Sequence, residues 1–141
     1  MNKKVIIITI LFTAIGAALG TFLVRLITGS NSSLSYDQVL VQVANETNKS
    51  LPMMIDRETR LDATVAGPGK RFTYSYTLVH LTRNDLDLSA FRTTMQPRLV
   101  ANYKTHVDMK GFRDENVELH YQYKDKDSNF LIDIVVSPKD F

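Results

Sequence analysis

The segment at residues 56–62, with the sequence DRETRLD, holds the densest group of side chains that could perform acid–base chemistry. Two carboxylates held close together can act as a general acid and a general base. Asp56, Glu58 and Asp62 are therefore the candidates for an envelope hydrolase or a small-ligand-binding site. Each of these acids also has an arginine nearby, which is typical of an exposed strand with complementary surface charges. We favour the exposed strand and keep the acid–base site as the alternative.

Residues 125–129, DKDSN, are similar to the first five positions of a calcium-binding loop. Such a loop needs glycine at its sixth position, for a sharp turn, and glutamate at its twelfth, to close the ligand shell. The chain has Phe130 and Val136 at these two positions. The segment therefore predicts a solvated turn between two strands and no calcium site.

Three histidines, His80, His106 and His120, are the remaining candidates for metal ligands. Strand alternation places His80 on the inward side of its strand and His120 on the outward side, and no pair has the helical i, i+4 spacing. The chain has no cysteine, which excludes thiolate ligands, thiol nucleophiles and disulfides. Motifs of serine nucleophiles, phosphate loops and zinc proteases are missing too. The sequence predicts no catalytic residue, no metal and no cofactor, and hence a protein that is not an enzyme.

The longest single element is an apolar run at residues 5–24 without a charged side chain. A helix of about 20 residues spans the roughly 30 Å of a bilayer's hydrocarbon core. The run therefore predicts a transmembrane anchor at residues 1–28. The alternative is a cleaved signal peptide with its cleavage site in the small residues at 18–20, but signal peptides have shorter apolar regions, of roughly 7–15 residues.

The charges that flank the run predict its orientation. Lys3 and Lys4 outweigh Arg25, so the N-terminus should be cytoplasmic and residues 30–141 should lie outside. In a bacterium this places the anchor in the inner membrane and the domain in the periplasm.

Gly16 and Gly20 form a GxxxG pair within the run. On a helix the two glycines share one face, where the missing side chains let a second helix approach closely. Glycine is also common in membrane spans that do not pair. The pair therefore leaves two options, a helix-dimer face that makes a homodimer and an ordinary membrane span.

The charge of the exported part excludes one class of partner. Three of the 17 basic residues flank the apolar run, which leaves 14 basic and 15 acidic side chains in residues 30–141. A nucleic-acid-binding domain needs a concentrated basic face. The nearly neutral domain therefore predicts no nucleic-acid partner.

Two helices are expected in the exported part, after a short polar tether at residues 29–35. Ser35 and Gln38 form a capping box, so the first helix should begin directly after Ser35 and end near Asn48. A second apolar helical period follows Asp87, where Asp85 or Asp87 can serve as the cap. Proline lacks a backbone N–H and clashes with the preceding turn, so Pro97 should kink or break this second helix.

Period-two alternation predicts strands at residues 51–65, 71–81, 117–124 and 130–136. A turn with two glycines at residues 67–69 joins the first two strands into a hairpin. The resulting order, α–β–β–α–β–β, predicts an α+β fold for residues 36–141. We expect two layers, an antiparallel four-stranded sheet with helices on one face.

The alternation also assigns the two faces of the sheet. The inward side chains are large and should be buried under the helices: Phe72, Tyr74, Tyr76, Leu119, Tyr121, Ile132 and Ile134. The outward side chains form a mixed surface that could contact a protein partner: Thr73, Ser75, Thr77, His120, Gln122, Leu131, Asp133 and Val135. The alternative is that scattered apolar residues on an exposed sheet have no function.

The pattern of residues 51–78 resembles that of a group of small, uncharacterised bacterial proteins that are exported or membrane-anchored. The segments that carry the resemblance are 52–56 (PMMID), 59–62 (TRLD), 67–69 (GPG) and 74–78 (YSYTL). The resemblance implies a bacterial envelope setting, and it implies no activity, ligand or site residue.

Two functional hypotheses follow from these patterns. The leading one is a membrane-anchored, non-enzymatic envelope protein whose exported domain binds another protein. In one version it is an immunity or exclusion factor against an incoming protein, and in the other an accessory subunit of an envelope complex. The alternative is the hydrolase or ligand-binding domain built on residues 56–62.

Overall fold

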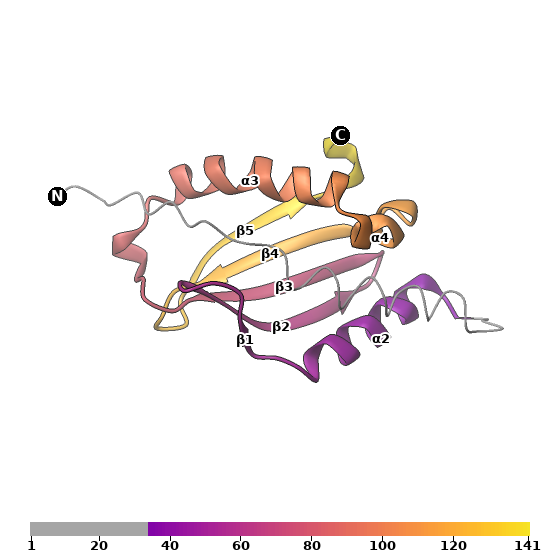
Figure 1. The fold of residues 1–141 in the computed structure, drawn as a ribbon, viewed down its shortest axis with the longest axis horizontal. Helices are drawn as coiled ribbons and strands as arrows, with labels where there is room; N and C mark the ends of the chain where they lie inside the picture. The colour runs from indigo at the N-terminus through magenta and orange to yellow at the C-terminus, as the bar shows by residue number, and fades with distance from the viewer. Residues whose placement is uncertain (1–33) are drawn as a thin grey trace.

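The computed structural model describes residues 34–141, which form an α+β fold with three helices and five strands (Figure 1). The helices are α2 (Tyr36–Asn48), α3 (Leu88–Thr105) and α4 (Lys110–Asp114). The strands are β1 (Met53–Met54), β2 (Thr59–Gly67), β3 (Arg71–Leu78), β4 (Glu118–Lys124) and β5 (Phe130–Val136).

The sheet is mixed, and its strand order is β1-β2-β3-β4-β5. Neighbouring strands are antiparallel except for β3 and β4, which are parallel. The predicted α+β class is confirmed, whereas the prediction of a four-stranded antiparallel sheet is wrong. The chain leaves β3, returns through α3 and enters β4 in the direction of β3, as a crossover connection requires.

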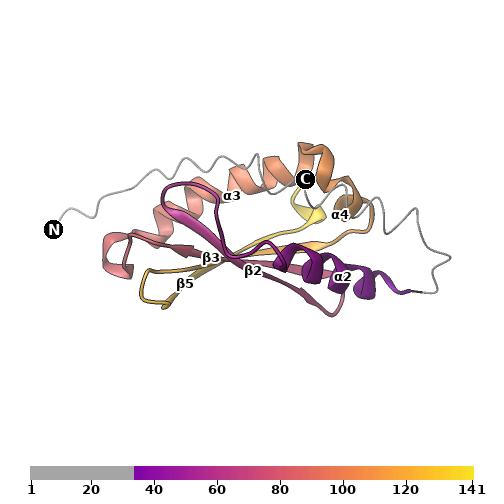
Figure 2. The same cartoon turned by 60° about the horizontal axis from the view of Figure 1, so that its bottom comes forward.

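All three helices cover one face of the sheet (Figure 2). The sequence predicts this arrangement for α2 and α3, whereas the short helix α4 was not predicted. Helix α2 lies over β2, where the Thr64 hydroxyl donates to the carbonyl of Ala44 at 3.3 Å. Helix α3 packs near the other edge, where the ring of Phe91 contacts Tyr123 with 5.0 Å between centroids. The buried side chains of helices and sheet form one continuous core.

Local signals set the helix boundaries. The Ser35 and Gln38 side chains form the predicted capping box of α2. The Asp87 carboxylate accepts from the amides of Ser89 and Ala90, at 3.0 and 3.1 Å, and caps α3. Pro97 lies within α3, which continues to Thr105. Of the two outcomes predicted for Pro97, a kink or a break, the break does not occur.

A ladder of four tyrosines forms the centre of the core: Tyr74 and Tyr76 of β3, and Tyr121 and Tyr123 of β4. Their rings stack with 5.1 to 6.5 Å between centroids. Burial, reinforced by the neighbouring tyrosines, raises the pKa of each of these hydroxyls well above its usual value. The ladder therefore acts as uncharged aromatic packing.

A β-bulge reverses the alternation of β2. The pairing with β3 shifts between Leu61 and Ala63. Leu61 is buried, but Val65 is 54% exposed and Thr64 takes the inward place. The sequence alternation put Leu61, Ala63 and Val65 on one face, and this is wrong because the extra residue of a bulge turns the following side chains over.

No helix within residues 34–141 has both the length and the apolar character needed to cross a bilayer. The predicted anchor at residues 1–28, with its Gly16 and Gly20, lies outside the described residues.

Candidate functional site

The side of the sheet opposite the helices, which we call the outward face, carries most of the predicted partner surface. Strand pairing aligns its side chains in rows across β2, β3, β4 and β5. One row contains Val65, Thr73, His120 and Val135, and the next contains Ala63, Ser75, Gln122 and Asp133. Six of the predicted residues are half-buried members of these rows: Thr73, Ser75, His120, Gln122, Asp133 and Val135.

Two of the predicted residues are not accessible. Thr77 is only 5% exposed, and its hydroxyl donates to the Asp62 carboxylate at 2.5 Å. Leu131 is 4% exposed and belongs to the core, at a shift in the pairing of β4 with β5. The prediction that both side chains lie on the solvated surface is wrong.

His120 is held between two carboxylates in the outward face. Its Nδ1 lies 2.8 Å from Asp133 Oδ2, and its Nε2 lies 2.8 Å from Glu118 Oε1. Each ring nitrogen thus has a carboxylate oxygen as its hydrogen-bond partner. Neither nitrogen remains to take a proton from a nucleophile such as the neighbouring Thr73. Both ring nitrogens of His120 are therefore engaged within the cluster, which makes it unsuited to general base catalysis.

Two carboxylates of the acidic segment at residues 56–62 have different structural roles. Asp56 Oδ1 accepts from the amides of Glu58 and Thr59, each at 2.8 Å, and stabilises the turn before β2. Asp62 lies at the bulge, where it pairs with Arg60 and accepts from Thr77. The structure gives Asp56 and Asp62 separate partners.

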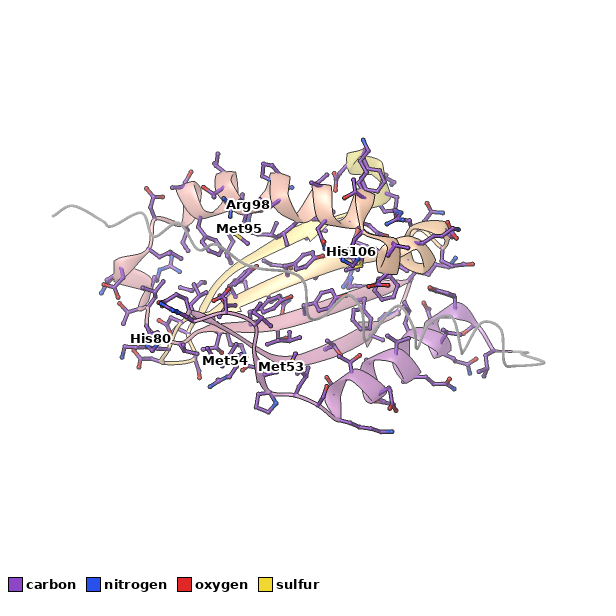
Figure 3. The ribbon with its side chains drawn as sticks, in the orientation of Figure 1. Met53, Met54, His80, Met95, Arg98 and His106 are labelled. Atoms are coloured by element: carbon purple, nitrogen blue, oxygen red, sulfur yellow. The ribbon has the colours of Figure 1, made fainter. Side chains whose placement is uncertain are left out.

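The three histidines lie in separate parts of the fold. Figure 3 shows His80 and His106 at opposite ends of the sheet. His80 follows the end of β3 and is exposed, so the prediction that it points inward is wrong. Residues 34–141 contain no group of three or more His, Asp or Glu side chains that could hold a metal ion.

The segment that is similar to a calcium loop forms the predicted turn between β4 and β5. The Asp125 carboxylate accepts from the amides of Asp127 and Asn129, each at 2.9 Å, and from the amide of Arg83 at 3.3 Å. Burial opposes the ionisation of Asp125, but these bonds and the Asn129 side chain hold its pKa below the usual value. The carboxylate thus stabilises its own turn.

A hollow of about 460 Å³ lies at one end of the outward face. It is formed where the turn between β2 and β3, the start of β4 and the turn after β5 meet. Its lining residues are Pro68, Gly69, Arg71, Asn116, Glu118, Ser137, Pro138 and Lys139. Sequence reasoning missed this hollow because the parallel pairing of β3 with β4, which sets Arg71 beside Glu118, was not predicted.

A family model described as a domain of unknown function (DUF8479) matches residues 35–132. The chain belongs to this family. The matched part of the DUF8479 domain runs from the cap of α2 into β5, and it includes the β2, β3 and β4 members of the two rows of the outward face. No curated protein matches the chain in sequence.

Three solved structures share the fold of this DUF8479 domain. A Vibrio vulnificus type 2 secretion system pilotin, EpsS, has a TM-score of 0.58 at 10% identity, over 73% of this chain and 88% of its own. The Vibrio cholerae type II secretion system pilotin AspS has a TM-score of 0.54 at 11% identity, over 74% and 91%. The Pseudomonas aeruginosa protein PA3611, thought to be secreted, has a TM-score of 0.57 at 12% identity, over 71% and 87%. At these identities the likeness establishes the fold alone.

Proposed function

We propose that this DUF8479 domain is a non-enzymatic, protein-binding module of the bacterial envelope, and that its outward face contacts the partner. The observation that carries the proposal is the composition of this face. On β2 and β3 the middle rows carry short uncharged side chains such as Ala63, Thr73 and Ser75, and on β4 and β5 the same rows carry the hydrogen-bonded pair His120 and Asp133. Charged pairs lie at its ends, with Arg60 and Asp62 at one end and Arg71 with Glu118 at the other. An uncharged patch, here on β2 and β3, with charged and polar groups around it is the usual arrangement of a protein interface.

Both the solved structures with a similar fold and the sequence support the proposal that the domain acts in the bacterial envelope. Two neighbours are pilotins of type 2 secretion systems, and the third is thought to be secreted. These likenesses favour an accessory subunit of an envelope complex over an immunity or exclusion factor. The resemblance of residues 51–78 to exported bacterial proteins supports the same setting. The acid–base alternative gains no support, because Asp56 and Asp62 have separate structural partners.

We propose further that residues 1–28 are a retained inner-membrane anchor, with the domain in the periplasm. A cysteine that replaces Ser32 is expected to react with a membrane-impermeant thiol reagent in intact spheroplasts. A cysteine that replaces Asn2 should react only after lysis, because it lies on the cytoplasmic side. A mature N-terminus near residue 21, found by N-terminal sequencing, would show instead that the segment is cleaved.

The outward face is tested by a charge placed at Val65, an exposed apolar position in one of its middle rows. Val65→Lys should leave the fold intact, since this side chain is 54% exposed, but it would put a charge into the interface. With a photo-crosslinker at Ser75, we expect one discrete crosslinked product in the host membrane, and an about tenfold lower yield with Val65→Lys.

Val41→Lys is the matched control, since Val41 is 47% exposed but lies on α2. This variant should give the full yield. The proposal fails if no product forms at Ser75, or if both lysine variants lower the yield equally while both keep their melting temperature.

A further inference from the structure

The hollow is continuous with the outward face. Arg71 pairs with Glu118 across the parallel strands, and the next outward row begins with Thr73 and His120. Glu118 belongs to the lining of the hollow, and it also bonds His120 in the outward face. A protein segment lying along the outward face would therefore end over the hollow.

The charges in the hollow leave a surplus of positive groups. Glu118 Oε1 lies 2.8 Å from His120 Nε2 and 3.7 Å from Arg71 Nε, so this carboxylate already has two partners. Within residues 34–141, the terminal guanidinium nitrogens of Arg71 and the ammonium of Lys139 have no partner. The Arg71 side chain is 51% exposed, which leaves these nitrogens accessible.

The wall of the hollow between β2 and β3 is held in place by hydrogen bonds. Gly69 and Lys70 have φ of +74° and +57°, the left-handed region. Their amides donate to the Asp37 carboxylate, at 3.1 and 2.7 Å. The Lys70 carbonyl accepts from the Glu118 amide at 2.9 Å, which ties this turn to β4.

The turn after β5 is fixed in a similar way, because Ser137 and Asp140 form a capping box around Pro138 and Lys139. A site whose walls are already ordered loses little entropy when it binds a ligand.

We propose that the hollow receives the carboxylate of an aspartate or glutamate from the protein partner, with Arg71 as its main donor and Lys139 as a second positive charge. This inference rests on the proposed function and names the chemistry that the partner offers. A guanidinium binds a carboxylate through two parallel hydrogen bonds, which is the geometry that the terminal nitrogens of Arg71 provide. Pro68 and Pro138 give apolar walls for the methylene groups of the same side chain.

The test uses the full chain in detergent and two dye-labelled peptides, one of alternating threonine and glutamate and one with glutamine in place of glutamate. Fluorescence anisotropy should show that the glutamate peptide binds at least tenfold more tightly, since a charge-assisted pair is lost in the glutamine peptide. Arg71→Gln should abolish the preference for the glutamate peptide, and Arg71→Lys should retain part of it. Lys126→Gln is the matched control, because Lys126 lies in the turn between β4 and β5 at the far end of the sheet and should leave the preference unchanged.

Several outcomes would overturn the inference. One is equal binding of the two peptides, and another is an equal effect of Arg71→Gln and Lys126→Gln, which would indicate only a general charge effect. A third is tighter binding of glycerol 3-phosphate than of the glutamate peptide, because this would indicate a lipid headgroup site. Crosslinks at Ser75 that persist at full yield in Arg71→Gln would refute the acidic contact while leaving the outward face as the interface.

Discussion

Asn48→Ala is expected to lower the free energy of unfolding by about 3 kcal/mol, a large part of the total for a domain of this size. Asn48 is the last residue of α2, and its side chain makes three hydrogen bonds to Thr64 of β2. Its Nδ2 donates to the Thr64 carbonyl at 2.8 Å, and its Oδ1 accepts from the Thr64 amide at 2.7 Å and the Thr64 hydroxyl at 3.0 Å. Thr64 is only 1% exposed, so removal of the Asn48 amide would leave the backbone N–H and carbonyl of Thr64 buried without these partners, whereas its hydroxyl could still donate to the Ala44 carbonyl.

The same change should promote association of the chain. Strand β1 covers the edge of β2 only at Arg60 and Leu61. Farther along this edge, the Asn48 amide takes the place of a neighbouring strand at Thr64. Uncovered strand edges pair with other chains, so Asn48→Ala should aggregate at temperatures where the native protein stays monodisperse.

Asn45→Ala is the matched control, because Asn45 is an exposed asparagine on the same helix. Alanine is the better helix former, so this variant should be neutral or slightly stabilising. Urea denaturation measures both free energies of unfolding. A loss below about 1 kcal/mol for Asn48→Ala, or an equal loss for the two variants, would show that the Asn48 amide does not stabilise the edge of β2.

The features that the sequence predicted correctly have local causes. The capping box at Ser35 and Gln38 placed the start of α2, and the turn at residues 67–69 gave the hairpin of β2 and β3. Strand β5 begins and ends at the predicted residues, 130 and 136. In each of these segments, neighbouring residues determine the backbone conformation.

The features that were missed depend on contacts between distant parts of the chain. The parallel pairing of β3 with β4 depends on where α3 packs, and two-residue strand β1 exists only because β2 pairs with it. The bulge at Asp62 is stabilised by Thr77, 15 positions away. The hollow needs residues near 69, 117 and 138 together, so no single motif could have indicated it.

Tyr121→Ala is expected to lower the free energy of unfolding by about 4 kcal/mol, so that most of the protein unfolds under mildly denaturing conditions. Tyr121 is 1% exposed and lies in the middle of the tyrosine ladder. Its ring stacks on Tyr74 and on Tyr76, with 5.2 and 6.5 Å between centroids. Alanine would remove these contacts and leave a cavity in the core between the sheet and the helices.

Tyr121→Phe measures the contribution of the Tyr121 hydroxyl to stability separately from that of the ring. The Tyr121 hydroxyl is buried and has no hydrogen-bond partner within the described residues, so its removal should be neutral or raise the free energy of unfolding by up to about 1 kcal/mol. The contrast is Tyr103→Phe, because the Tyr103 hydroxyl donates to the Val117 carbonyl at 2.7 Å. Removal of that hydroxyl leaves a buried carbonyl unpaired and should lower the free energy of unfolding by about 1–3 kcal/mol.

Thermal and urea denaturation of the three variants test the role of the ladder. The expected order of stability is Tyr121→Phe highest, Tyr103→Phe lower and Tyr121→Ala lowest. If Tyr121→Phe lowers the free energy of unfolding as much as Tyr103→Phe does, the Tyr121 hydroxyl has a hydrogen-bond partner in the folded protein. Full stability of Tyr121→Ala would mean that the ladder does not form the centre of the core. The outward face could then not be assigned from strand alternation, since a one-residue change of register exchanges the two faces of a sheet.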